Sequence, residues 1–223
     1  TGIEAHVYGD VNVNLNQYDG TCESGGGVFG CNNANGSPDG HVTVHVYKTY
    51  KAGITKDESK TTLQERLQSV STYDLTAVYG GGNQADYKPT KTNDFAEVII
   101  DGCDNVTIRE VYGGGYGAAT PATQVKVKGS YLINEVFGGG YGAGDNNPGA
   151  NVGFYDYSKD EDKEWCDEKE ERDPDDLRFN SESAKSIVRS RVPTLVVFTA
   201  LVHRVFGGSN TKGNVRKTAL TLL

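Results

Sequence analysis

VYGGG occupies residues 78–82 of this chain, and the same five letters return at residues 111–115. Four near-copies, each a valine, an aromatic residue and at least one glycine, begin at Val7, Val28, Val136 and Val205. The shorter intervals between copies are 21, 25 and 33 residues, and the longer ones, of 50 and 69 residues, each contain a segment of different character. A Val-aromatic-Gly phrase that returns in this way indicates a structural repeat.

Apolar and polar residues alternate between the copies of the phrase. The alternating segments are residues 11–15, 41–46, 96–100, 124–128 and 194–198. Alternation over five or six positions is typical of a half-buried strand. Short strands and a glycine-rich turn in every unit predict a parallel β-solenoid, and the usual hand of parallel crossovers makes it a right-handed parallel β-helix. We therefore expect an all-β fold, with residues 1–223 forming one domain.

The phrase itself is expected to form the corner of each coil. Glycines there would allow positive φ angles and would let stacked backbones approach closely. The aromatic residues would then stack from coil to coil in one ladder, consisting of Tyr8, Phe29, Tyr79, Tyr112, Phe137 and Phe206. Each neighbouring pair of such a ladder contributes about 0.5–1.5 kcal/mol beyond its buried area.

The first of two inserts spans residues 51–74. Leu63 and Leu67 are spaced as on one face of a helix, and this part of the insert contains no glycine or proline. The pattern predicts a short helix, with Asp57 or Ser59 as its N-cap.

The second insert, residues 154–190, is acidic. Residues 156–176 contain twelve Asp or Glu and four Lys or Arg, which accounts for the whole formal charge of −8. A neutral remainder without a basic stripe excludes nucleic acid as a partner. We interpret the acidic run as a solvated surface segment with short helical parts. The sequence also contains no apolar stretch long enough to predict a membrane span.

The glycine-rich phrases with their surroundings, VYGDVNVNL, GGGVFG, VYGGGN, VYGGGYG and VFGGGYG, resemble the repeats of large secreted or cell-surface β-helix proteins of gut Bacteroidales. The resemblance covers most of the chain outside the two inserts. It implies an extracellular or cell-surface location and an adhesin-like role, and it implies no particular activity.

Two ligand motifs rich in glycine do not fit. A phosphate loop needs a lysine after its second glycine, and no copy of the phrase has one. A calcium β-roll needs an aspartate two places after its third glycine, where Gly144 and Ala119 stand in the two best copies. We therefore expect no cofactor and no metal site.

Two carboxylates occupy equivalent positions just before the phrase. Glu110 and Glu135 would stack one coil apart, with Arg109 beside the first. These three residues are the candidates for catalysis if the chain is a polysaccharide lyase or a glycosidase, because such enzymes use paired carboxylates. The alternative is an ordinary ladder facing solvent, whose charges nearby Arg and Lys relieve.

Four tyrosines are candidates for binding, namely Tyr79, Tyr112, Tyr116 and Tyr141. If their rings are exposed, they form a strip on which sugar rings can stack. If they are rungs of the aromatic ladder, they are structural.

The cysteines leave two alternatives. Cys22 and Cys31 are close enough in sequence to bridge in an oxidising compartment, or all four, with Cys103 and Cys166, are free and packed. For function, the sequence favours a non-catalytic surface protein. Its expected partner is either a glycan or a surface protein of the host or of bacteria. A carbohydrate-active enzyme is the alternative.

Overall fold

The structure is a computed structural model that describes residues 5–16, 26–49, 57, 59–90, 94–143, 150–153, 194–215 and 218–222. The acidic insert, residues 154–190, therefore lies outside the described residues. The elements are β1 (Val11–Asn16), β2 (Gly27–Phe29), β3 (Val42–Lys48), α1 (Leu63–Ser69), β4 (Leu75–Tyr79), β5 (Ala96–Asp101), the 3-10 turn η1 (Cys103–Asn105), β6 (Thr107–Tyr112), β7 (Thr123–Phe137), β8 (Thr194–Phe206) and β9 (Ala219–Leu222). The expectation of an all-β fold is confirmed.

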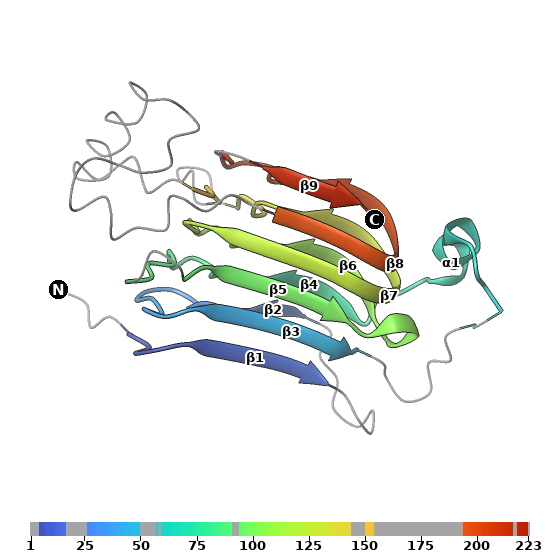
Figure 1. The fold of residues 1–223 in the computed structure, drawn as a ribbon, viewed down its shortest axis with the longest axis horizontal. Helices are drawn as coiled ribbons and strands as arrows, with labels where there is room; N and C mark the ends of the chain where they lie inside the picture. The colour runs from blue at the N-terminus through green and yellow to red at the C-terminus, as the bar shows by residue number, and fades with distance from the viewer. Residues whose placement is uncertain are drawn as a thin grey trace.

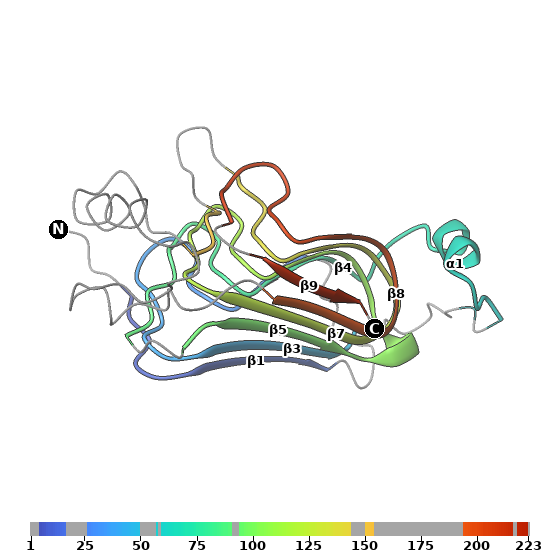
Figure 2. The ribbon, with the colours of Figure 1, turned by 45° about the horizontal axis from the view of Figure 1, so that its top comes forward.

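All strand pairs are parallel and belong to one nine-stranded sheet. Its strands lie in two rows (Figure 1). The first row has the order β1-β3-β5-β7-β8-β9, and the second has the order β2-β4-β6-β7-β8. The long strands β7 and β8 belong to both rows, because each bends from the first row round into the second, as Figure 2 shows.

The apolar core lies between the two rows. From the first row, Val44 and Val98 are fully buried, and from the second, Val78, Val111 and Val136 are fully buried in the same cluster. In each row these valines are register partners on neighbouring strands. The buried valines therefore form a continuous line across the strands of each row. Burial of each such side chain contributes about 1.5–3 kcal/mol relative to exposure.

The aromatic ladder is confirmed for five of its six predicted members. Phe29, Tyr79, Tyr112, Phe137 and Phe206 stack in this order, with ring centroids 4.6–4.9 Å apart and planes within 12° of parallel. Each of these rings ends a strand segment of the second row.

The prediction was wrong for Tyr8, which is 85% exposed and whose ring lies near His6. Val7 makes a bridge to Pro38, in the segment that leads into the first row. The first copy of the phrase therefore precedes a first-row strand, whereas the other five end second-row strands.

The corner glycines allow close approach of stacked backbones, as predicted. A Cβ atom added to Gly113 would lie 2.6 Å from the carbonyl oxygen of Gly138, and one added to Gly138 would lie 2.7 Å from that of Gly207. The expected positive φ was wrong for these residues. Within the described residues, positive φ among glycines occurs only at Gly9, Gly36, Gly142, Gly153 and Gly213, so Gly9 is the one phrase glycine that shows it.

Helix α1 lies in the first insert, but its N-cap is Thr62 and not Asp57 or Ser59. The Thr62 side chain accepts a hydrogen bond from the backbone N–H of Glu65, and the Glu65 carboxylate accepts one from the backbone N–H of Thr62. This reciprocal capping box satisfies two N–H groups of the first turn. Asp57 instead accepts hydrogen bonds from the backbone and the hydroxyl of Ser59.

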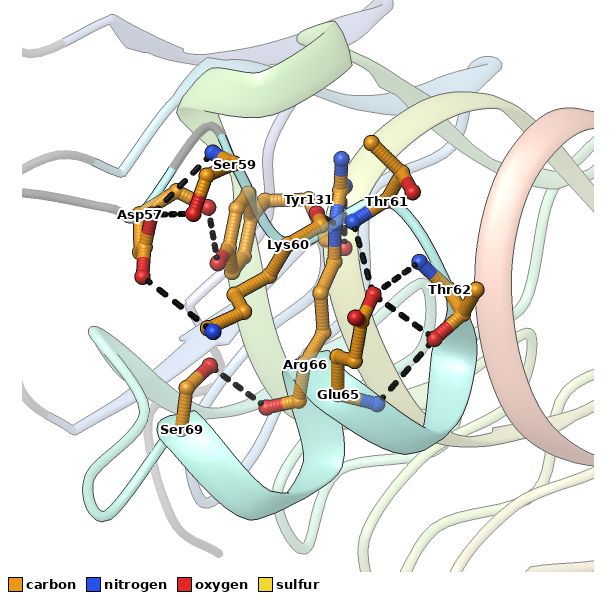
Figure 3. A network of polar contacts seen from close by, with 9 residues as sticks. All are labelled: Asp57, Ser59, Lys60, Thr61, Thr62, Glu65, Arg66, Ser69 and Tyr131. Atoms are coloured by element: carbon orange, nitrogen blue, oxygen red, sulfur yellow. Dashed lines mark hydrogen bonds and ion pairs between the residues drawn. The ribbon is translucent and has the colours of Figure 1, made fainter.

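One arginine attaches α1 to the sheet (Figure 3). The guanidinium of Arg66 donates to the carbonyl of Tyr131 at 2.8 Å and lies 4.1 Å from the centroid of the Tyr131 ring. It also donates to the carboxylate of Asp104 at 3.0 Å. Tyr131 lies at the bend of β7, between its first-row and second-row parts. No helix in the described part of the chain is long and apolar enough to cross a membrane.

Candidate functional site

The outer face of the second row brings the predicted site residues together. Val111 points into the core, so its neighbours Glu110 and Tyr112 point to the opposite face. The strand register places Glu110 beside Glu135, and Glu135 beside Arg204. We call this surface the outer strip and define it as Arg109, Glu110, Tyr116, Glu135, Tyr141, Arg204 and Asn210.

Each carboxylate of the strip has its own cation. Arg109 Nε lies 3.6 Å from Glu110 Oε1, and Arg204 forms an ion pair with Glu135. The two carboxylate side chains are 17% and 14% exposed. The expected stacking of Glu110 and Glu135 is thus confirmed, and two arginines offset the repulsion between them.

Tyr79 and Tyr112 are buried rungs of the ladder. The Tyr112 hydroxyl donates to Glu110 Oε2 at 3.0 Å and accepts from the side-chain amide of Asn210 at 2.8 Å. Burial raises the pKa of Tyr112 well above its ordinary value, and the negative charge of Glu110 raises it further. Burial likewise raises the pKa of Tyr79. Both phenols therefore keep their protons to higher pH than a free tyrosine, and that of Tyr112 is a fixed donor to Glu110.

Tyr116 and Tyr141 cover the ladder and remain half-exposed. Their rings stack on each other, with centroids 4.9 Å apart and an angle of 11° between planes. Tyr116 packs edgewise on Tyr79 at 5.8 Å, and Tyr141 packs edgewise on Tyr112 at 5.9 Å. Of the four predicted tyrosines, these two are the ones that a ligand reaches without displacing the ladder.

Besides Arg204, which is the register partner of Glu135, the strip residue absent from the candidates predicted from sequence is Asn210. It stands four places after the last ladder aromatic, just as Tyr116 and Tyr141 stand four places after theirs. The backbone confirms the equivalence, because Asn210 N–H donates to the Gly140 carbonyl just as Tyr141 N–H donates to that of Gly115. Counting positions from the phrase would have found it.

The described cysteines differ in their surroundings. The Cys31 thiol is free and donates to the carbonyl of Gly80 at 3.5 Å, and burial raises its pKa. Cys103 is free and exposed, which differs from the packed environment that was one of the two alternatives. Cys22 and Cys166 lie outside the described residues.

Within the ranges that the structure describes, no group of three or more His, Cys, Asp or Glu is placed to hold a metal ion. Comparison of the chain with protein-family models, with curated proteins and with solved structures finds no match.

Proposed function

We propose that the chain is a non-catalytic scaffold of the extracellular space or cell surface, built as a right-handed parallel β-helix, that contacts a glycan through the outer strip. The observation that carries this proposal is the half-exposed, stacked pair of Tyr116 and Tyr141 beside the hydrogen-bonding groups of Glu110, Glu135 and Asn210. The resemblance to glycine-rich surface proteins of gut Bacteroidales supports the same location and role.

The order of strands supports the β-helix. From β1 to β6 the chain alternates between the first and the second row, and β7 and β8 pass from one row to the other without a break. Each passage through both rows is one coil, and the next coil pairs with it in parallel. A solenoid of such coils keeps its outer positions in register, which suits an extended ligand.

The chemistry of the strip suits a sugar. Aromatic rings offer an apolar surface, while carboxylates, amides and phenols accept or donate hydrogen bonds in fixed directions. Because Arg109 and Arg204 neutralise Glu110 and Glu135, the strip carries no uncompensated charge of one sign. The glycan that fits is therefore a neutral one, with hydroxyl groups as its main polar contacts.

A glycosidase is the second candidate, because Glu110 and Glu135 stand on adjacent strands. Adjacent strands lie about 4.8 Å apart, which is close to the roughly 5–5.5 Å between the carboxyls of retaining glycosidases. That reaction needs both carboxyls free to act on the substrate, whereas here an arginine engages each of them in an ion pair. The ion pairs therefore favour the scaffold.

A glycan panel that measures both retention and product release tests the proposal. We expect retention of neutral glycans by the wild-type chain and at least tenfold weaker retention by the double variant Tyr116→Ala/Tyr141→Ala. Tyr8→Ala removes an exposed ring elsewhere and serves as the matched control. Release of reducing ends or unsaturated sugars that Glu110→Gln abolishes would establish the enzyme instead, and absence of retention would refute glycan contact.

A further inference from the structure

The fourth residue after each ladder aromatic belongs to a second column, which runs beside the ladder. Its members are Asn33, Asn83, Tyr116, Tyr141 and Asn210, which follow Phe29, Tyr79, Tyr112, Phe137 and Phe206 respectively. We call these five residues the amide–tyrosine column. Three of them already belong to the outer strip, and Asn33 and Asn83 extend it beyond the tyrosine pair, in the turns that follow β2 and β4.

Backbone hydrogen bonds hold the amide–tyrosine column in register. Each member after Asn33 donates its N–H to the carbonyl just before the previous member, at 2.9–3.1 Å. The residue after each of these members donates to the carbonyl of the previous member, at 2.7–2.9 Å. This is the pattern of parallel strands, which lie about 4.8 Å apart, so the four steps of the column span roughly 19 Å. The 4.9 Å between the rings of Tyr116 and Tyr141 agrees with that step.

Amide side chains lie on both sides of the tyrosine pair. Asn83 Nδ2 donates to Asn33 Oδ1 at 2.7 Å, and Asn210 Nδ2 donates to the Tyr112 hydroxyl at 2.8 Å. These bonds orient the amides. Asn33 and Asn210 are exposed and Asn83 is half-buried. Because an asparagine side chain offers two N–H donors and two acceptor positions, each of the three can still donate to or accept from a ligand.

The surface around the tyrosine pair is uncharged along the column. The residues one place further along the chain are Ala34, Gln84, Gly117, Gly142 and Thr211, so neither of these two adjacent columns contains a charged residue. Aromatic rings flanked by amides suit a sugar whose hydroxyls both donate and accept hydrogen bonds. A charged polymer would lose hydration here without gaining an ion pair in return.

We propose that the ligand of the outer strip is a linear, neutral oligosaccharide that lies along the amide–tyrosine column and so runs across the strands of the second row. A single sugar ring covers the tyrosine pair alone, because the flanking amides lie further along the column. A chain of sugars reaches Asn210 on one side of the pair, and Asn83 and Asn33 on the other. The inference rests on the glycan contact proposed above and adds the shape and the direction of the ligand.

Calorimetric titration of the full chain with the cello-, manno- and xylo-oligosaccharides of two to six residues tests this inference. In a series that binds, we expect the affinity to rise at least tenfold from the shortest oligosaccharide that binds to the hexasaccharide. Asn33→Ala/Asn83→Ala is expected to weaken binding of the hexasaccharide at least fivefold and that of the shortest ligand less than twofold. Asn12→Ala/Asn14→Ala removes two exposed amides from β1, in the first row, and is the matched control.

The outcomes separate this inference from the glycan contact itself. Equal affinity at every length would overturn the inference while the glycan contact stands. A double variant that weakens long and short ligands alike, or weakens neither, would also overturn it, since the two amides would then be structural. If urea titration shows that the double variant is unstable, Asn33→Ala alone, at an exposed side chain, provides the same comparison. Absence of binding by every oligosaccharide and by the whole glycan panel would refute the glycan contact, and this inference with it.

Discussion

Gly113, which follows β6, lies directly against Gly138, which follows the neighbouring strand β7, so that a Cβ atom on Gly113 would be 2.6 Å from the Gly138 carbonyl oxygen. The same relationship links Gly138 to Gly207, and the N–H groups of Gly113 and Gly138 donate across the same interface. The phrase that repeats along the chain thus marks a place where neighbouring backbones lie close together. Lack of space for a Cβ atom, and not a positive φ angle, is the reason for glycine at positions 113 and 138.

Gly113→Ala is expected to destabilise the fold by about 1–3 kcal/mol, the usual cost of forcing an extra methyl into a packed site. The obstructing atom is a backbone oxygen, which cannot rotate away as a side chain would. The free energy of unfolding from urea titration measures the effect. Gly208→Ala is the matched control, because a Cβ there meets nothing within 4 Å. Equal stability of the two variants would contradict close approach as the reason for glycine.

Arg66→Ala is expected to release α1 from the sheet while the sheet itself persists. The substitution removes the hydrogen bonds to Tyr131 and Asp104 and the contact with the Tyr131 ring, which together contribute about 1–3 kcal/mol. Hydrogen exchange of peptides from residues 59–74 should accelerate at least tenfold, and exchange in β5 should not change.

Gln64→Ala, on the exposed side of the same helix, controls for the effect of an alanine substitution on the helix itself. If it accelerates exchange as much as Arg66→Ala does, the arginine is not the attachment.

Much of the fold could be predicted because the phrase has a fixed position relative to the strands. The aromatic ladder and the pairing of Glu110 with Glu135 both follow from aligning copies of the phrase. The phrase gave a wrong prediction for Tyr8, which does not join the aromatic ladder. The residues of the phrase do not reveal which row the following strand joins. The segment of Tyr8 instead lies beside the approach to the first row, where Val7 makes a bridge to Pro38, a residue distant in sequence.

The start of α1 and the exposure of the tyrosines could not be predicted, for a related reason. Asp57, Ser59 and Thr62 are all suitable N-caps, and the choice of Thr62 depends on Glu65 reaching back to complete the capping box. Alternation places Tyr112 on the outer face, but it does not show that Tyr141 returns to cover that face. Contacts between neighbouring strands and the turns that follow them decide both burial and accessibility, and these contacts are distant in sequence.

The cysteine thiols are expected to differ sharply in reactivity. In a Cys22→Ser/Cys166→Ser background, a thiol reagent should label Cys103 rapidly and Cys31 only after unfolding. Cys103 is exposed, whereas burial raises the pKa of Cys31 and so lowers its population of reactive thiolate. The additional variant Cys103→Ser should abolish the rapid phase. Rapid labelling that persists in this variant would show that the Cys31 environment opens in the native state.

Tyr112 is expected to make stability decrease at high pH. Burial raises the pKa of this phenol in the folded chain above its unfolded value of about 10. Below pH 10 both states bind the proton and the contribution to stability is complete. Above pH 10 the unfolded state loses its proton first, so stability falls, by about 1 kcal/mol per pH unit for one such group.

Urea titrations at pH 8 and pH 11 measure this effect. Tyr112→Phe should be less stable than wild type at pH 8, because Glu110 and Asn210 lose a hydrogen-bond partner there. At pH 11 the difference between the two proteins should shrink or reverse, since phenylalanine cannot ionise in the unfolded chain. Tyr8→Phe, at an exposed ring, controls for the removal of one phenol. A constant difference between Tyr112→Phe and wild type across the two pH values would mean that the buried phenol does not govern the alkaline decrease in stability.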